Sequence, residues 1–222
     1  MACIRMFVVC GCLALGLCLG SPARAAIVIT EVHPTGSANA SYGADWFELT
    51  NTGAAAVDIT GWRMDDNSNS FASSVALRGV TSIAPGQSVI FAEGNASGSN
   101  DPTIQANFIT AWFGGAAPIG FTMGGYGGSG VGLSSSGDAV NIFDSVGNLI
   151  ARVDFGASTL GTTFDNAAGL TGTISTLSVA GVNGAFVSPV GEIGSPGVVP
   201  EPASAALLIG AIGALLMRRR IA

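Results

Sequence analysis

Between residues 26 and 199, apolar and polar residues alternate in short stretches, and no stretch keeps a helical period for long. Gly, Asn, Ser and Asp separate these stretches, as turn residues separate the strands of an all-β sandwich or barrel. The pattern predicts strands at Ala26–Val32, Asp45–Asn51, Ala55–Met64, Ser88–Ala92, Phe108–Trp112, Ala139–Phe143, Leu149–Phe155 and Ile174–Val179.

Two segments have the pattern of β-hairpins. In residues 45–66, Phe47 and Leu49 point to one face of a strand, and their neighbours point to the other face. The turn-forming residues 51–53 follow, and a second alternating stretch comes after them. Residues 137–156 repeat this arrangement around another turn. We therefore predict two hairpins, the first with one apolar face.

Residues 113–132 hold nine glycines and interrupt the strand pattern. Each glycine loses much conformational entropy when it becomes ordered, so a rigid site is not expected here. We predict a long loop or a loosely paired excursion. Phe121 and Tyr126 either form a mobile contact surface or, as we favour, pack down over the sandwich.

The end of the chain carries a proline pair, an uncharged apolar stretch and an arginine cluster. The stretch Ala203–Met217 has 15 residues, which as a helix would reach about 22 Å, short of a bilayer core of about 30 Å. Clustered arginines can snorkel to the interface and stay cytoplasmic, so the body of the protein would lie on the other side. The alternative is a buried core helix, which an arginine cluster disfavours. The motif residues are Pro200, Glu201, Pro202, Arg218, Arg219 and Arg220.

This order of motifs in residues 198–222 resembles the PEP-CTERM sorting signal. The resemblance implies recognition by a membrane protease called exosortase, removal of the tail, and release or attachment outside the cell. It also implies a Gram-negative bacterium that makes exopolysaccharide, with the chain held in the inner membrane by residues 203–217 until it is processed.

The beginning of the chain has the features of a secretory signal peptide. A basic residue precedes the apolar run Met6–Gly20, and Ala23 and Ala25 form an Ala-x-Ala site. We predict that signal peptidase removes residues 1–25. A retained membrane anchor is the alternative, and a lipoprotein is disfavoured because a large leucine precedes Cys18.

Composition narrows the chemistry of the exported part. All four cysteines lie within the predicted signal peptide, so the rest can form no disulfide, thiolate nucleophile or cysteine-based metal site. Residues 26–199 carry three arginines, no lysine and 13 acids, a net charge of −10. This charge argues against nucleic acid as a partner and fits a solvated acidic surface, cation binding or repulsion of other polyanions.

Five stretches occur in the order seen in lamin tail domains. They are IVITEVHP, DWFELTNTG, VDITGWRMDD, IAPGQSVIFAEG and SSSGDAVNIFDSVGNLIARVDFG. The chain resembles this family, which occurs in nuclear lamins and in many exported bacterial proteins. The resemblance implies one immunoglobulin-like β-sandwich over residues 26–197 that closes at the GSPG stretch, 194–197. The glycine-rich stretch 113–132 departs from the family pattern.

Few residues are candidates for catalysis. His33 is the only histidine, so a zinc site would need carboxylates beside it, and no nucleophile-elbow sequence supports a Ser–His–Asp arrangement. We interpret His33 as structural or exposed. A glycosidase needs two carboxylates, and Glu48, beside Trp46 in a predicted strand, is the most interesting acid. Glu31, Asp65 and Asp66 are further candidates only because they are acids. The alternative for Glu48 is a hydrogen-bonded core or edge carboxylate.

The stretch DDNSNS, residues 65–70, is the best candidate for a metal site. Asp65, Asp66 and Asn69 could form an irregular surface Ca²⁺ site in an exported acidic protein. Ser70 and Ala76 replace the Gly and Glu of an EF-hand, so the segment is not one. The alternative is a plain Asx-rich turn after a strand.

These observations favour an exported, non-catalytic β-sandwich that binds or scaffolds at the cell surface or in the extracellular matrix. No cofactor is expected apart from the calcium alternative. The expected partners are signal peptidase, exosortase, and exopolysaccharide or other surface proteins. Two other functions stay open, namely a calcium-dependent adhesion module and an extracellular hydrolase that uses carboxylates.

Overall fold

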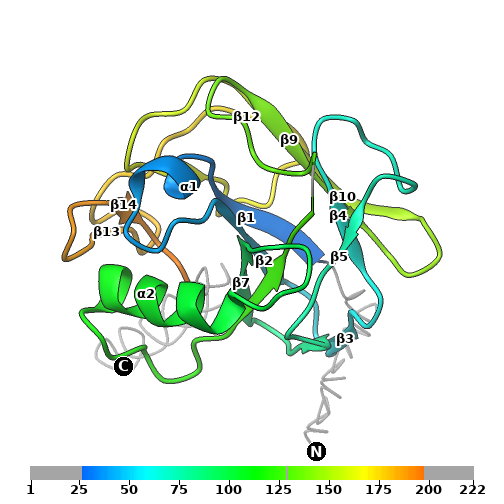
Figure 1. Cartoon of the computed structure of the whole chain (residues 1–222), viewed down its shortest axis with the longest axis horizontal. Helices are drawn as coiled ribbons and strands as arrows, with labels where there is room; N and C mark the ends of the chain where they lie inside the picture. Colours follow the sequence, from blue (N-terminus) through cyan, green and yellow to red (C-terminus); the bar gives the residue numbers. More distant parts are fainter. Residues whose placement is uncertain (1–26, 129, 198–222) are drawn as a thin grey trace, which may run out of the picture.

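The computed structural model describes residues 27–128 and 130–197, which form two facing five-stranded sheets (Figure 1). The first sheet runs in the order β11–β1–β2–β7–β8, with the bounds Phe164–Asp165, Ile27–His33, Trp46–Asn51, Ser88–Glu93 and Met123–Tyr126. The second runs in the order β12–β10–β9–β4–β5, with the bounds Gly172–Ile174, Leu149–Phe155, Asp138–Phe143, Arg63–Asp65 and Val75–Ala76. The all-β sandwich predicted from the sequence is confirmed.

Two short strand pairs and two helices complete the fold. The pairs are β3 (Val57–Asp58) with β6 (Ser82–Ile83), and β13 (Phe186–Val187) with β14 (Ile193–Gly194). The helices are α1 (Gly36–Asn39) and α2 (Asp101–Phe113). The pairs β7–β8 and β10–β12 are parallel, and the other pairs between named strands are antiparallel.

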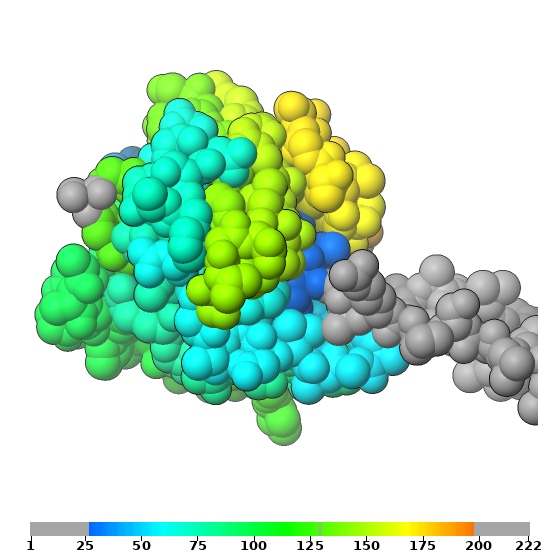
Figure 2. Space-filling model, turned by 90° about the vertical axis from the view of Figure 1, so that its right-hand side faces the viewer, coloured from blue at the N-terminus to red at the C-terminus, as the bar shows by residue number. Residues whose placement is uncertain are grey.

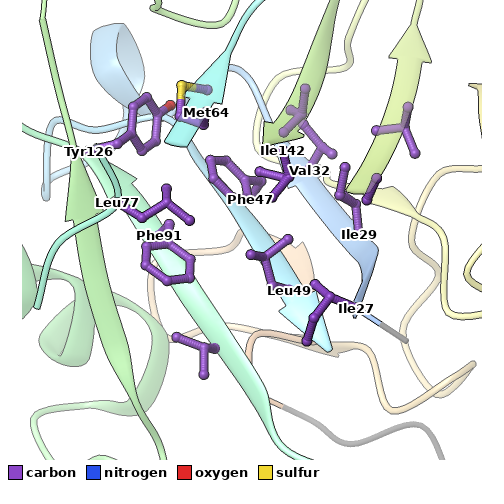
Figure 3. Packing of buried hydrophobic residues seen from close by; sticks show 14 of the residues in the cluster. Ile27, Ile29, Val32, Phe47, Leu49, Met64, Leu77, Phe91, Tyr126 and Ile142 are labelled. Carbon is purple, nitrogen blue, oxygen red and sulfur yellow. The ribbon is translucent and has the colours of Figure 1, made fainter. Parts of the chain in front are cut away.

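Apolar side chains from both sheets fill the space between them (Figure 3). Phe47 and Leu49 point into this core, as their alternation predicts, and neither is exposed to solvent. Phe47 stacks on Phe91 of the neighbouring strand, with 5.8 Å between ring centroids. Burying such side chains contributes about 1.5–3 kcal/mol each, so this core supplies most of the driving force for folding.

Helix α2 adds a third layer on the outer face of the first sheet, alongside β7 (Figure 1). Trp46 of β2 and Ile90 of β7 pack there against Phe108 and Trp112 of the helix. The strand β2 is therefore buried on both faces. We call this second apolar group the aromatic cluster; its buried members are Tyr42, Ala44, Trp46, Ile90, Ala92, Ile104, Phe108, Ala111 and Trp112.

The predicted strand Phe108–Trp112 is wrong, because these residues belong to α2. Pro102 lies in the first turn, where its missing N–H is tolerated, and Gly114 ends the helix in the left-handed conformation with φ of 67°. The buried helical positions, Ile104, Phe108, Ala111 and Trp112, recur at the spacing of one helix face. The helical spacing is visible only over the whole of α2, whereas the five residues 108–112 taken alone have the composition of a strand.

The predicted hairpin over residues 45–66 is also wrong. The strand β2 pairs with β1 and β7, whereas β3 pairs with β6, and β4 pairs with β5 and β9 in the second sheet. The chain therefore crosses between sheets after the turn at residues 51–53, and the predicted strand Ala55–Met64 becomes two short ones. The predicted hairpin over residues 137–156 is confirmed, since β9 and β10 pair antiparallel.

The glycine-rich stretch holds an ordered strand, β8, which corrects the prediction of a loop or loosely paired excursion. Glycine is needed for close packing: a Cβ on Gly124 would lie 2.5 Å from the Arg78 carbonyl oxygen and 2.8 Å from the Phe91 ring. The inward packing of the two aromatic residues is confirmed. Tyr126 is fully buried in the core, and Phe121 packs against the aromatic cluster.

On the face drawn in Figure 2, the loop between β4 and β5 (cyan) lies beside the β9–β10 hairpin (yellow-green). Phe71 of this loop packs edge-on against Phe143, with 5.8 Å between ring centroids. The last predicted strand, Ile174–Val179, is largely wrong, because β12 ends at Ile174 and only an isolated bridge at Leu177 follows. A strand of three residues is too short to show the alternation of apolar and polar residues from which strands are predicted.

The predicted signal peptide, 1–25, and the predicted tail, 198–222, lie outside the described residues. Within residues 27–128 and 130–197, no helix is long and apolar enough to cross a membrane.

Arg78 ties β8 to the beginning of α2. Its Nε and Nη2 atoms donate to the Asp101 carboxylate at 2.5 and 3.0 Å, and Nη2 also donates to the Tyr126 carbonyl oxygen at 2.9 Å. Charge-assisted bonds of this type contribute about 1.5–3 kcal/mol each when one partner is removed. The arginine therefore holds the edge strand and the helix layer together.

We expect Arg78→Ala to lower the free energy of unfolding by about 2 kcal/mol, measured by denaturant titration. Arg152→Ala is the matched control, because Arg152 is similarly exposed and, among the described residues, its guanidinium bonds to Asp154 and Asn141 within the β9–β10 hairpin. We expect the control to lose about 1 kcal/mol or less. Equal losses in the two variants would contradict the linking role of Arg78.

Candidate functional site

Two buried carboxylates lie side by side on the outer face of the first sheet. Glu31 of β1 and Glu48 of β2 are directly opposite each other in the antiparallel ladder, and each is at most 1 % exposed. Residues opposite each other across two strands share a face. A register shift between Ile29 and Glu31 directs Glu31 to the outer face while Ile29 stays in the core. We call Glu31 and Glu48 the carboxylate pair.

Each carboxylate accepts hydrogen bonds from side chains and from the backbone. Thr30 Oγ1 donates to Glu48 Oε1 at 2.6 Å, and the Gly197 N–H donates to Glu48 Oε2 at 2.6 Å. Thr163 Oγ1 and the Ser195 N–H both donate to Glu31 Oε1, at 2.5 and 2.7 Å. Glu31 Oε2 has no hydrogen-bond partner among the described residues.

Further hydroxyl groups extend this network on both sides. Thr30 and Thr50 are joined at 2.8 Å, and Thr50 and Ser88 at 2.6 Å. Thr163 is joined to Ser178 at 2.6 Å. These hydroxyls replace part of the water that the two carboxylates lose on burial, which is why a polar patch is tolerated beneath a covering layer.

Burial raises the pKa of both carboxyl groups. Desolvation, together with repulsion from Glu48, raises the pKa of Glu31 to about 8. Desolvation raises the pKa of Glu48 to about 7, against hydrogen bonds from Thr30 and Gly197 that favour the charged form. Near neutral pH the pair therefore keeps at least one proton, since two neighbouring negative charges in a dry site are strongly disfavoured.

A pair of carboxylates that share a proton is suited to acid–base chemistry, but this pair is closed to solvent. The segment 194–197 lies over it, and a Cβ on Gly194 would come within 2.7 Å of Glu31 Oε1. No substrate can reach either carboxylate unless this segment moves. The hydrogen-bonded core position that the sequence suggested as the alternative for Glu48 is the one observed.

His33 lies on the same face, at the side where the aromatic cluster begins. Its ring stacks on Trp46 with 5.6 Å between centroids and meets Trp112 edge-on at 6.3 Å. Neither ring nitrogen has a hydrogen-bond partner among the described residues, and Glu192 Oε1 lies 3.7 Å from Nε2. Desolvation lowers the pKa of His33 to about 4, so the ring is neutral near pH 7. Its full burial agrees with the structural interpretation.

The three residues of the predicted calcium site occupy a tight turn. Asp65 is buried and accepts hydrogen bonds from Ser68 Oγ at 2.6 Å and from the Ser70 N–H at 2.7 Å. Asp66 Oδ1 accepts the Ser68 N–H at 2.9 Å, and Asn69 is in the left-handed conformation with φ of 48°. The side chain of Asp65 therefore serves the turn, as in an Asx-rich loop.

The donor set fits calcium poorly. Across the described part of the chain, no group of three or more His, Cys, Asp or Glu side chains could hold a metal ion. Calcium usually takes six to eight oxygen ligands, with several carboxylates among them. Calcium binding through Asp65, Asp66 and Asn69 stays a prediction from the sequence.

We expect millimolar Ca²⁺ to leave the melting temperature of the protein unchanged, because the donor set fits calcium poorly. A ligand held only by the native state would raise the melting temperature. Differential scanning calorimetry with Ca²⁺ or with a chelator measures this directly. A rise of several degrees that Asp66→Asn abolishes would show instead that the loop binds calcium.

Sequence reasoning found Glu48 but not its pairing with Glu31. The two acids occupy corresponding positions in alternating stretches, ITEVH and WFELT, and this was the only signal for a shared face. Thr163, Ser178 and the backbone of residues 195–197 were missed. They lie more than 110 residues further along the chain, in short irregular segments without alternation.

Comparison with protein families matches the chain to the Lamin Tail Domain over residues 20–157, more than half of its length. A comparison with curated proteins found no match. The matched range contains all strands from β1 to β10, whereas β11 and β12 lie beyond it and extend one edge of each sheet. The carboxylate pair lies within the match, and the segment that covers it lies outside. The chain belongs to the lamin tail domain family.

Proposed function

We propose that this protein is an exported, non-catalytic module that binds or scaffolds at the cell surface or in the extracellular matrix. One observation carries the non-catalytic part. The acids best placed for acid–base work, Glu31 and Glu48, bind the backbone of their own chain beneath a closed layer. Membership of the lamin tail domain family, a non-enzymatic immunoglobulin-like family, supports the same conclusion.

The two ends of the sequence support export and sorting. Residues 1–25 have the pattern of a signal peptide, and the order of Pro200–Pro202, Ala203–Met217 and Arg218–Arg220 resembles a PEP-CTERM signal. The proposal is that a Gram-negative host exports the chain through its inner membrane, that the tail holds it there briefly, and that an exosortase then removes the tail. The sandwich would act outside the cell.

The charge of the sandwich supports a choice among partners. A net charge of −10 over residues 26–199 disfavours nucleic acid and acidic polymers. Exopolysaccharide of low charge and other surface proteins remain as the partner classes. Binding to either would use the exposed loops and strand edges, because the interior of the sandwich is filled.

The test of sorting is the intact mass and the C-terminal peptide of the protein from its native cells, in membrane and medium fractions. We expect a chain that begins at Ala26, ends near Pro200–Pro202 and lies outside the cell. The double variant Pro200→Ala, Pro202→Ala is expected to retain residues 203–222. A wild-type chain that keeps Ala203–Ala222 in the membrane fraction would contradict sorting and indicate a permanent anchor.

The test of the non-catalytic assignment is a panel of polysaccharide and nucleic-acid substrates, assayed with the wild type and with Glu48→Gln. We expect no turnover by either protein. Turnover by the wild type that Glu48→Gln removes, with an unchanged circular dichroism spectrum, would favour the hydrolase alternative.

A further inference from the structure

The segment 194–197 is fitted closely to the carboxylate pair. Its Ser195 and Gly197 N–H groups bind Glu31 and Glu48, one each. A Cβ on Gly194 would lie 2.7 Å from Glu31 Oε1 and 2.9 Å from the Trp112 ring. A Cβ on Gly197, where φ is 75°, would lie 2.8 Å from the Phe121 ring. Only glycine at these two positions allows the segment to lie this close to the sheet.

No positive charge neutralises the pair within the described residues. Their three arginines make contacts elsewhere: Arg63 with Ser74, Arg78 with Asp101, and Arg152 with Asp154. Two carboxylates that face each other without a cation cannot both ionise in a dry site. A second charge on the pair therefore requires water. Water can reach the pair only if the segment 194–197, which we call the cover, moves.

We propose that the carboxylate pair is a pH-dependent latch, which holds the segment 194–197 on the sheet while it keeps a proton and releases the segment when that proton is lost. The inference concerns the fold itself and does not depend on export or sorting.

The cover is the part that we expect to give way. Glu31 and Glu48 are anchored in β1 and β2, which lie inside the first sheet with the core beneath them; β2 pairs along its length with β1 and β7, and β1 pairs with β2 and, at Glu31 and Val32, with β11. The segment 194–197 is held by its bonds to the pair and, at its beginning, by the two-residue strand β14, whose Ile193 bonds to Gly161 and Thr163. The difference in anchoring makes release of this segment the easiest way to hydrate the pair.

The direction of the pH dependence follows from the raised pKa values. Free glutamate titrates near 4.5, whereas the latched pair titrates near 7 and 8. The latched state therefore binds more protons than the open state from about pH 4.5 up to about pH 8. The stability of the latch is therefore complete below about pH 4.5 and falls as the pH rises through 7 to 8.

Other titratable groups near the pair are engaged by other partners. His33, two residues along β1, stays neutral above about pH 4. Glu192 lies beside His33, and burial raises its pKa, but it contacts Tyr42 and not the pair. Asp165, opposite Glu31 on β11, accepts hydrogen bonds from the Ala167 N–H and from Asn183.

The test is hydrogen exchange of the full chain, solubilised in detergent, at about pH 5.5 and about pH 8.5. The measured quantity is the protection factor of the Ser195 and Gly197 amides, that is, the exchange rate relative to an unstructured peptide at the same pH. We expect this factor to fall at least about tenfold at the higher pH, while the β9–β10 hairpin keeps its protection.

Three variants make the test specific. Glu31→Gln keeps the shape of the side chain and removes one charge and the repulsion between the two acids, so the fall in protection between the two pH values should become smaller, and Glu48→Gln serves in the same way if the first variant does not fold. Gly194→Ala should lower protection at both pH values by wedging the segment off the pair. Asp165→Asn is the matched control for a nearby carboxylate and should fall as the wild type does. Equal protection of the wild type at both pH values, or an unchanged fall in both glutamine variants, would overturn the latch.

Discussion

Replacing Trp46 by alanine is expected to lower the free energy of unfolding by about 3–5 kcal/mol. Trp46 is fully buried in a central strand and contacts His33, Phe108 and Trp112 through its ring, and its Nε1–H donates to the Tyr42 hydroxyl at 3.3 Å. Alanine would leave a cavity between the sheet and α2, and the Tyr42 hydroxyl would lose the hydrogen bond that it accepts from Trp46. Domains of this size are stable by about 5–15 kcal/mol, so the loss is a large fraction of the total.

Urea unfolding followed by circular dichroism measures this loss. The control is Val146→Ala at the tip of the β9–β10 hairpin, where the side chain is 77 % exposed, and we expect a change within about 0.5 kcal/mol. A loss for Trp46→Ala as small as that of the control would show that the helix layer contributes little to the fold. Loss of α2 protection in hydrogen exchange, without global unfolding, would localise the effect to the aromatic cluster.

Local alternation was enough to predict the strands that lie between two layers or at a regular hairpin. Phe47 and Leu49 mark β2, and the observed β10 has the predicted bounds Leu149–Phe155. In both strands the side-chain period of two is long enough to be read, because one set of positions faces the core. The sandwich class followed from such segments together with the turn residues between them.

What the sequence did not predict depends on contacts between distant segments. The turn at residues 51–53 signals a reversal but not the partners of the strands that follow: β3 pairs with β6, and β4, from which Met64 packs into the core, joins the second sheet. The stretch Phe108–Trp112 is rich in residues that favour strands, yet its longer period and the docking of Trp112 make it helical. Tertiary packing overrides local preference in both cases.

The carboxylate pair was only half predictable for the same reason. Glu48 is visible as a polar residue inside an apolar strand, but its pairing with Glu31 depends on the register shift after Ile29. The cover over the pair comes from residues 194–197, beyond the range that matches the family, and nothing local in that stretch indicates its target. A single sequence thus locates the buried acid and leaves its protonation to be found from the structure.

His33 should govern the loss of stability in acid. Its pKa in the folded protein is about 4, below the usual value of 6.5, so the unfolded chain binds more protons than the folded one between these values. The contribution of His33 to stability is therefore complete above about pH 6.5 and is lost as the pH falls through 4. From pH 7 to pH 4 this loss amounts to roughly 3 kcal/mol.

Glu192 gives little compensation for a charge on His33. Its carboxylate oxygen lies 3.7 Å from Nε2, and burial raises its own pKa, which disfavours the charged form that would balance an imidazolium. The carboxylate pair acts in the opposite direction, since its stabilising effect grows as the pH falls. After the opposite effect of the carboxylate pair is subtracted, the fall in the free energy of unfolding below about pH 6.5 therefore measures the contribution of His33.

We expect His33→Phe to remove most of the acid-side loss. Phenylalanine can keep the stacking on Trp46, and no hydrogen bond within the described residues is given up, because neither ring nitrogen has a partner there. Urea unfolding of the wild type and the variant at about pH 7 and about pH 4 should show a difference in pH response of roughly 2–3 kcal/mol. Glu192→Gln is the control and should keep the acid-side loss. An identical pH response of the wild type and His33→Phe would mean that other groups determine stability in acid. It would also mean that a charged His33 ring is tolerated between Trp46 and Trp112.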